Sequence, residues 1–524
     1  MGVGSQSVSG TDESRIAAER QEGSRWTRLT RADRLAVLIA VAVIAVVTVP
    51  RLPAGVCYGD GGDLQFASAT LGIAHPPGYT GYVTLGFLLT LVPWVEPAYM
   101  VSLGCLAAGV VAVWLCMLMQ IRLGANAWVA GMVGLGLTAL PRVWQNLLAP
   151  EVYAPSLAFL AGSAYLLLKY TRLGKRRDLL LAALLFGVAA ANRPPVLFAL
   201  PFFAVAGLQA CVRWEGSWRR SVPRLVAAAG CMVLPAVYAL GFLWVRDTPQ
   251  AACNYIEQYN AETRALPASD AGAGAGLRRV IWHASAEQFR NNMGNTWGGV
   301  RSKLRWLRRE LGPQQRATQV IVAAIVILGA VIAGRRCGAS VWLLGGMAAQ
   351  SVIFVCMYRV YGQAADLLPL LWAVAVAIGV ALSPLVPRQA NRTRRLAVMG
   401  LLIVVCAWTA VDAADRPREA RAADATAFIK AVDLATFPAD AVICSSWGTS
   451  PPLWYARHVL TGRGDIRIIN AGARHWLRMI EDYPGRPVFF TDSRVRLPQG
   501  CELKPFRKLW RLEREPEASA GKHE

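Results

Sequence analysis

The chain has 524 residues, of which 55% are hydrophobic and 17% charged, with a mean hydropathy of +0.36 and a formal net charge of +22. Soluble domains carry about 25% charged residues, and the apolar residues here occur in long runs such as residues 35–49 and 370–382. About 20 helical residues cross a bilayer. The composition therefore excludes a soluble enzyme, a disulfide-stapled secreted domain and a disordered chain, and it predicts a polytopic α-helical membrane protein.

The excess positive charge lies largely in short loops between the apolar runs, for example at residues 172–177 and 388–395. Positive residues in short loops mark the cytoplasmic side of a membrane protein. Membrane orientation explains the basic composition better than nucleic-acid binding does. We therefore expect membrane lipids, and no nucleic acid, as partners.

Residues 1–33 predict a disordered basic tail in the cytoplasm, and residues 34–412 predict a transmembrane domain. A first outer loop is expected at residues 54–97 and a long outer loop at 246–316. Within the first loop, residues 79–95 are interpreted as a re-entrant or juxtamembrane helix, because counting them as a span would place basic loops outside. About eleven spans are expected, at residues 35–49, 98–121, 127–143, 155–168, 179–191, 195–211, 225–245, 320–333, 340–357, 367–380 and 396–411.

Residues 413–524 differ from the rest, because charges are dense and no run could cross a membrane. Short apolar runs alternate with helical patterns, which predicts a small α/β domain with a parallel sheet. An odd number of spans places this domain on the extracytoplasmic side, and we expect a bacterial inner or plasma membrane. The strands are expected at residues 441–445, 465–470 and 487–491, and the helices at 450–460 and 474–483.

The most informative segment follows the first span. It runs Gly-Asp-Gly-Gly-Asp from Gly59 to Asp63 and, further on, His-Pro-Pro-Gly-Tyr from His75 to Tyr79. If a helix begins near the second glycine, both carboxylates project from one end of it. The same residues suit a helix cap and the positive end of the helix dipole. Spacing alone leaves the structural and the chemical interpretation open.

This segment resembles a hallmark of membrane proteins similar to the protein O-mannosyltransferases, which belong to the GT-C glycosyltransferase superfamily. Gly61 replaces the serine of the family pattern, and Asp63 replaces its glutamate. The resemblance implies a GT-C-like helical core. Weaker matches occur at residues 149–153, 191–194 and 361–369.

The resemblance also implies a reaction, in which a sugar passes from a polyprenyl-phosphate donor to an acceptor hydroxyl. It makes Asp60 the general base that accepts the hydroxyl proton, with Asp63 as the second candidate. Arg193 and Arg359 are expected near the outer ends of spans, where they would bind the leaving phosphate or snorkel to the interface. The other expected substrate-binding residues are His75, Tyr79, Glu151, Tyr153 and Asn192.

We expect inverting transfer of a hexose such as mannose to a protein or glycan acceptor. No cofactor is required, and a divalent metal is not indicated because no third ligand joins the two carboxylates. Basic residues interleaved with tryptophans at residues 278–309 predict a segment at the membrane interface. Two alternatives stay open: a transporter or lipid flippase, with ionisable groups near mid-membrane, and a non-catalytic assembly protein with the same fold.

Overall fold

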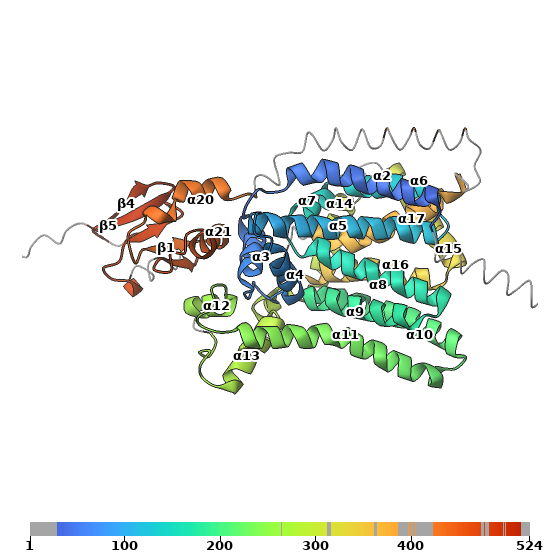
Figure 1. Cartoon of the computed structure of the whole chain (residues 1–524), viewed down its shortest axis with the longest axis horizontal. Coiled ribbons are helices and arrows are strands. Elements are labelled where there is room, and N and C mark those ends of the chain that lie inside the picture. Colours follow the sequence, from blue (N-terminus) through green and yellow to red (C-terminus); the bar gives the residue numbers. More distant parts are fainter. Residues whose placement is uncertain are drawn as a thin grey trace, which may run out of the picture.

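In a computed structural model, the chain forms a helical bundle with a small sheet at one end (Figure 1). The expected span at residues 396–411 and the tail up to residue 28 fall wholly or almost wholly outside the described part. The structure describes residues 29–263, 265–311, 316–360, 364–385, 423–472, 481–495, 497 and 499–514, with the single positions 393, 397, 400, 404 and 476.

The helices follow the expected apolar runs. The first begins at Arg31, because the side chains of Thr30 and Asp33 each accept the other residue's backbone N–H in a capping box. The helices of the bundle and its loops are α2 (Arg31–Thr48), α3 (Gly59–Thr70), α4 (Thr80–Thr90), α5 (Pro97–Arg122), α6 (Ala127–Ala139), α7 (Pro141–Leu148), α8 (Tyr153–Leu173), α9 (Arg176–Asn192), α10 (Leu200–Glu215), α11 (Trp218–Arg246), α12 (Tyr255–Thr263), α13 (Ala273–Ala284), α14 (Trp297–Leu311), α15 (Arg316–Arg336), α16 (Ala339–Met357) and α17 (Leu368–Leu382).

Six of the described helical segments are long and apolar enough to cross a bilayer, and a seventh is obtained if α7 and α8 form one span bent by 106°. Two expected spans fall on shorter helices, α6 with 13 residues and α9 with 17. Residues 79–95 contain the 11-residue helix α4. The helical polytopic class is confirmed, while the described helices contain fewer long spans than the eleven expected.

The surface of α11 is suited to lipid. This helix is strongly apolar, yet only 6% of its most apolar window is buried inside the protein. Val226, Leu234 and Val237 are each more than half exposed. Apolar surface on this scale is unfavourable in water and favourable against lipid tails. By contrast, α5 lies inside the bundle and packs against α6, α8 and α17.

The two ends of the bundle are different. The helices α3, α4, α12 and α13, which come from the two expected outer loops, lie at the end that faces the sheet (Figure 1). The turn between α10 and α11 lies at the opposite end. The basic loop after α8 lies beside it, because Trp214 near the end of α10 donates its indole N–H to the carbonyl of Tyr170. Among the described residues, the outer-loop helices α3, α4, α12 and α13 and the basic loops after α8 and α10 are thus separated by the length of the bundle.

The C-terminal sheet has the order β2-β1-β3-β5-β4. The first three strands are parallel, as predicted, and an antiparallel hairpin that was not predicted extends the sheet. The small α/β region is confirmed. Its elements are α20 (Thr426–Val432), β1 (Val442–Ser445), α21 (Ser450–Tyr455), β2 (Arg467–Asn470), β3 (Val488–Phe490), β4 (Cys501–Phe506) and β5 (Leu509–Arg514).

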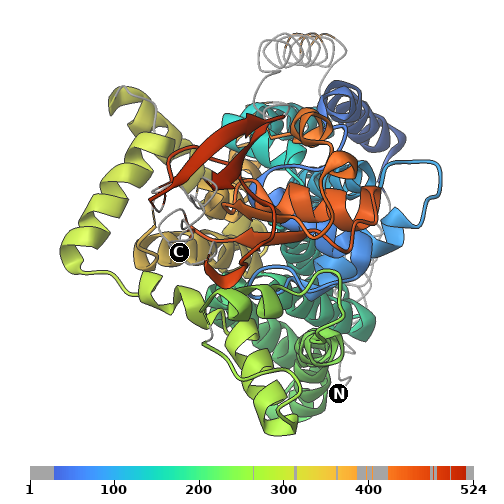
Figure 2. The same cartoon turned by 90° about the vertical axis from the view of Figure 1, so that its left-hand side faces the viewer.

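One face of this sheet packs against the first outer loop. Successive residues of a strand point to opposite faces, and Ile443 and Phe489 share an apolar cluster with Leu64 and Phe66 of α3. Their neighbours in the strands belong to a separate cluster around Trp476. Figure 2 shows the sheet region in front of the end of the bundle. The first outer loop and the C-terminal region therefore share one core.

Candidate active site

The acidic segment forms the first turn of α3. The helix begins at Gly59, close to the start that the sequence indicates. Gly62 is pressed against the preceding loop, where an added Cβ would lie 2.0 Å from the carbonyl oxygen of Cys57. A glycine is needed for this close approach. It fixes the direction in which Asp60 and Asp63 leave the helix.

Asp63 holds His75. The Asp63 carboxylate is completely buried, and its Oδ2 accepts the backbone N–H of His75 at 2.8 Å and lies 2.8 Å from His75 Nδ1. Burial disfavours the charged imidazolium, but the hydrogen bond to Asp63 and the charges of Asp60 and Asp63 outweigh it, so the pKa of His75 is raised. Asp63 therefore orients the ring.

Asp60 is the accessible member of the pair, since its side chain is 53% exposed. Its Oδ2 lies 4.0 Å from His75 Nε2, and its Oδ1 accepts the indole N–H of Trp447 at 2.6 Å. One imidazole thus lies between two carboxylates and presents a different nitrogen to each. An exposed carboxylate in this setting can take a proton from a bound hydroxyl.

Glu151 lies beside this pair, in the break between α7 and α8. Burial, and after it the charge of Asp60, raise the pKa of Glu151 to about 7, while His75 and Arg193 act in the opposite direction. Tyr153 follows at the start of α8, and its ring lies 4.6 Å from the guanidinium carbon of Arg193. Glu151 therefore lies between the acidic pair and an arginine.

Arg193 is buried inside the protein, with 7% of the residue exposed. It follows the last residue of α9 and forms an ion pair with Asp366 of the short helix η4 (Ala364–Leu367). Snorkelling to the interface does not describe this geometry. Its neighbour Asn192 accepts the backbone N–H of Tyr82 at 2.9 Å, and it therefore fixes the start of α4.

Arg359 and Tyr79 occupy different surroundings. Arg359 is exposed, and its backbone and side chain donate to the carbonyls of Asn292 and Gly294 in the long outer loop, at 2.8 and 2.6 Å. The Tyr79 ring meets the edge of His75, with ring centroids 5.0 Å apart.

The structure therefore gathers most of the expected site residues around His75. Contacts with Asp60, Asp63 and Tyr79 are direct, and Glu151, Tyr153 and Arg193 follow beside them. Asn192 and Arg359 contact other segments. Sequence reasoning did not select Asp366, although it lies in a weak family match, and it missed Trp447, for which no local signal exists. Among the described residues, no group of three or more His, Cys, Asp or Glu side chains is placed to hold a metal ion.

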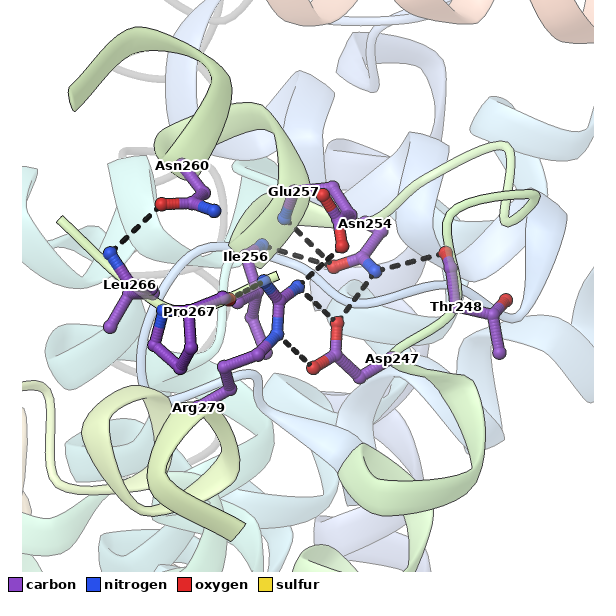
Figure 3. Close-up of polar contacts among 9 residues, drawn as sticks. All are labelled: Asp247, Thr248, Asn254, Ile256, Glu257, Asn260, Leu266, Pro267 and Arg279. Atoms are coloured by element: carbon purple, nitrogen blue, oxygen red, sulfur yellow. Dashed lines mark hydrogen bonds and ion pairs between the residues drawn. The ribbon is translucent and has the colours of Figure 1, made fainter. Parts of the chain in front are cut away.

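The long outer loop supports the segment that carries His75. Ile73 forms a parallel bridge with Asn254, and the Asn254 side chain donates to Asp247 at 2.9 Å. Asp247 in turn pairs with Arg279, which also contacts Glu257 (Figure 3). Arg279 was expected with its neighbours at the membrane interface. It is instead completely buried, because these two carboxylates and a carbonyl enclose its guanidinium.

The family model that matches this chain covers a segment of its first half. Residues 60–213 match the family model of the protein O-mannosyl-transferase TMEM260 N-terminal domain. The match begins at Asp60 and includes His75, Glu151 and Arg193. The expected family resemblance is confirmed. Protein O-mannosyl-transferase TMEM260 of Mus musculus is 39% identical over 106 residues, which are 20% of this chain and 15% of the mouse protein. The chain thus matches only a small part of that relative's length.

Solved structures are similar at low sequence identity. ArnT from Cupriavidus metallidurans bound to undecaprenyl phosphate aligns with 91% of this chain and 97% of its own, at 13% identity and a TM-score of 0.49. ArnT from the same organism in the apo state aligns with 87% of this chain and 92% of its own, at 12% identity and a TM-score of 0.49. The S. cerevisiae protein O-mannosyltransferase Pmt1-Pmt2 complex bound to the sugar donor aligns with 44% of this chain and 35% of its own, at 16% identity and a TM-score of 0.37.

Proposed function

We propose that this protein is a membrane glycosyltransferase that transfers a hexose, such as mannose, from a polyprenyl-phosphate donor to a hydroxyl of a protein or glycan. The observation that carries the proposal is the half-exposed Asp60 carboxylate beside His75, in a segment that matches a protein O-mannosyl-transferase domain. A neutral hydroxyl is a weak nucleophile, and a carboxylate within reach activates it. Asp60 is that group.

The reaction is a single displacement. The acceptor oxygen forms a bond to the anomeric carbon, its proton passes to Asp60 Oδ2, and the bond between that carbon and the phosphate oxygen breaks. The polyprenyl phosphate leaves, and the anomeric configuration inverts. His75 Nε2 lies 4.0 Å from the Oδ2 that gains the proton, and Asp63 holds the ring in this orientation through Nδ1. Asp63 is therefore a positioning residue.

The leaving phosphate gains negative charge, which fixed cations stabilise. Arg193 is a buried cation beside the Tyr153 ring, its charge also acts on Glu151, and Asp366 holds it in place. Arg359 supplies a second, exposed cation at the same end of α16. The Phe354 ring lies 6.0 Å from the guanidinium carbon of Arg193 and stacks at 5.2 Å on the ring of Tyr358, which is the chain neighbour of Arg359. We assign the donor phosphate to this edge of the site and the acceptor to the side of Asp60.

We place this end of the bundle on the extracytoplasmic side of a bacterial inner or plasma membrane, with the N-terminus in the cytoplasm. The positions of the loops support this orientation, because the basic turns after α8 and α10 lie at the opposite end. Short loops rich in arginine and lysine stay in the cytoplasm.

The test uses purified protein in liposomes with radiolabelled polyprenyl-phosphate mannose and a mixture of peptide and glycan acceptors. The wild type should move label to an acceptor. Asp60→Asn should reduce the rate by about 100- to 10,000-fold, the usual contribution of a general base. Asp270→Asn, which changes an exposed carboxylate of the long outer loop, is the matched control.

The outcomes separate the alternatives. A flippase would move the labelled lipid between leaflets with the sugar still attached, and a non-catalytic assembly protein would leave it unchanged. Either result in the wild type contradicts the proposal. Transfer by Asp60→Asn at the wild-type rate would show that another residue acts as the base.

A further inference from the structure

The C-terminal region reaches the candidate base through one turn. This turn joins β1 to α21, and Thr449 and Ser450 both donate their backbone N–H to the carbonyl of Ser446 within it. It leaves the carboxyl end of a central parallel strand, the edge at which α/β sheets usually bring side chains to a ligand. Trp447 stands in this turn.

The position of the turn is fixed by backbone contacts to the first outer loop. Gly59 donates its backbone N–H to the carbonyl of Gly448 at 3.0 Å, and Tyr58 donates to the carbonyl of Ala423 at 2.8 Å. Gly59 and Gly448 are the immediate neighbours of Asp60 and Trp447. The carboxylate and the indole are therefore brought together by the main chain on both sides.

The contact itself has a defined direction. An indole N–H can only donate, so Trp447 donates to Asp60 Oδ1, at 2.6 Å. The Trp447 ring also stands edge-on to His75 and to Tyr255 of the long outer loop, each with ring centroids 5.7 Å apart. These contacts leave Oδ2 of Asp60 on the side of His75. The carboxylate is thus held in one orientation by a residue of the C-terminal region.

We propose that Trp447 is a positioning residue of the candidate active site, which orients Asp60 through its indole N–H and makes the C-terminal region part of the transferase. This inference rests on the proposed function. A base contributes fully only when its free oxygen points at the reacting hydroxyl, and Trp447 occupies the other oxygen. The sheet region is then more than a separate module, because it completes the first outer loop.

The test compares variants that separate the N–H from the ring. Trp447→Phe keeps an aromatic ring and loses the donor, and it should lower kcat by about 10- to 100-fold, the range for a hydrogen bond to a charged group, with little change in the KM of the donor. Trp447→His keeps an aromatic N–H and should recover part of this loss. If Trp447 acted only by packing, Trp447→Phe would instead retain a higher kcat than Trp447→His. Trp476→Phe, which loses an indole N–H bond to the carbonyl of Ala471 elsewhere in the same region, should retain wild-type kcat.

A second measurement does not depend on activity. In protein labelled with nitrogen-15 at its 18 tryptophans, the indole signal that is missing in Trp447→Phe belongs to Trp447. It should move upfield in Asp60→Ala, because the charged acceptor is gone. An unmoved signal, or wild-type kcat in Trp447→Phe, would overturn the inference while the proposed function stands. A wild type that transfers no sugar would overturn the proposed function. The shift of the indole signal would then test only the contact between Trp447 and Asp60.

Discussion

Two charged clusters lie at the same end of the bundle, and they satisfy their charges in opposite ways. In the outer-loop cluster, Arg279 donates to both oxygens of Asp247 at 2.7 Å, to Glu257 at 2.6 Å and to the Pro267 carbonyl at 2.9 Å (Figure 3). In the site cluster, formed by Asp60, Asp63 and His75, Asp60 is half exposed and Oδ1 of Asp63 has no hydrogen-bond partner among the described residues.

The difference separates a structural cluster from a reactive one. A buried charge whose hydrogen-bonding groups are all used is held rigid and has nothing left to offer a substrate. The half-exposed Asp60 carboxylate, with an imidazole beside it, still has a proton acceptor available. The outer-loop cluster therefore stabilises the loop that supports His75, and the site cluster carries the chemistry. The predictions below test this division.

The largest effect is expected in the outer-loop cluster. Arg279→Met leaves the 4% exposed Asp247 and the partly buried Glu257 without their cation, which should cost about 3–5 kcal/mol of unfolding free energy. The measurement is the apparent Tm in detergent. Arg290→Met removes an exposed arginine paired with Glu287 and should change little. The double variant Asp247→Asn/Arg279→Met should be more stable than Arg279→Met, and a Tm of Arg279→Met equal to that of Arg290→Met would contradict a structural role.

A smaller effect is expected at Asp63. Asp63→Asn keeps an oxygen that can accept the His75 backbone N–H, but it removes the charge that orients the ring. Carboxylates that orient a histidine at metal sites contribute about 10- to 100-fold to activity, and we expect a loss of this size here, while the Tm should stay close to the wild type. Sugar transfer and thermal unfolding are measured on the same preparation. If Asp63→Asn were inactive while Asp60→Asn remained active, the roles of the two acids would be reversed.

The site cluster could largely be predicted from the sequence, because its members are close in the chain. Asp60, Asp63 and His75 lie within 16 consecutive residues, and a single helix and turn bring them together. The three parallel strands were predictable for the same reason, since each is a short apolar run between turn residues.

Long-range contacts were beyond such reasoning. Trp447 and Asp60 are 387 positions apart, and nothing in either local sequence indicates their contact. Arg279 is one of many arginines in residues 246–316. Only the folded loop determines that this arginine meets Asp247 and Glu257 whereas Arg290 remains exposed. Asn192 was expected to bind the substrate because of its place in a motif. It instead contacts Tyr82, and this contact depends on how α4 packs against α9.

The smallest expected effect is a pH dependence of stability at Glu151. This residue is intermediate between the fully paired outer-loop cluster and the accessible site cluster. Its pKa is raised to about 7, above the value of about 4.3 for an unfolded chain. The folded protein therefore holds a proton that the unfolded chain has lost, so stability from this group is complete below about pH 4 and is lost as the pH rises through 7. A pKa change of this size corresponds to about 4 kcal/mol of unfolding free energy, and solvent screening of this partly exposed carboxyl reduces the expected loss to about 1 kcal/mol. Glutamine at position 151 cannot ionise, so the Tm of Glu151→Gln should exceed that of the wild type at pH 8 and match it at pH 5. The control Glu287→Gln, which changes an exposed carboxyl, should follow the wild type at both pH values.

Parallel Tm curves for the wild type and Glu151→Gln would mean that Glu151 is already charged in the folded protein. Glu151 would then belong with the permanently paired carboxylates of the outer-loop cluster.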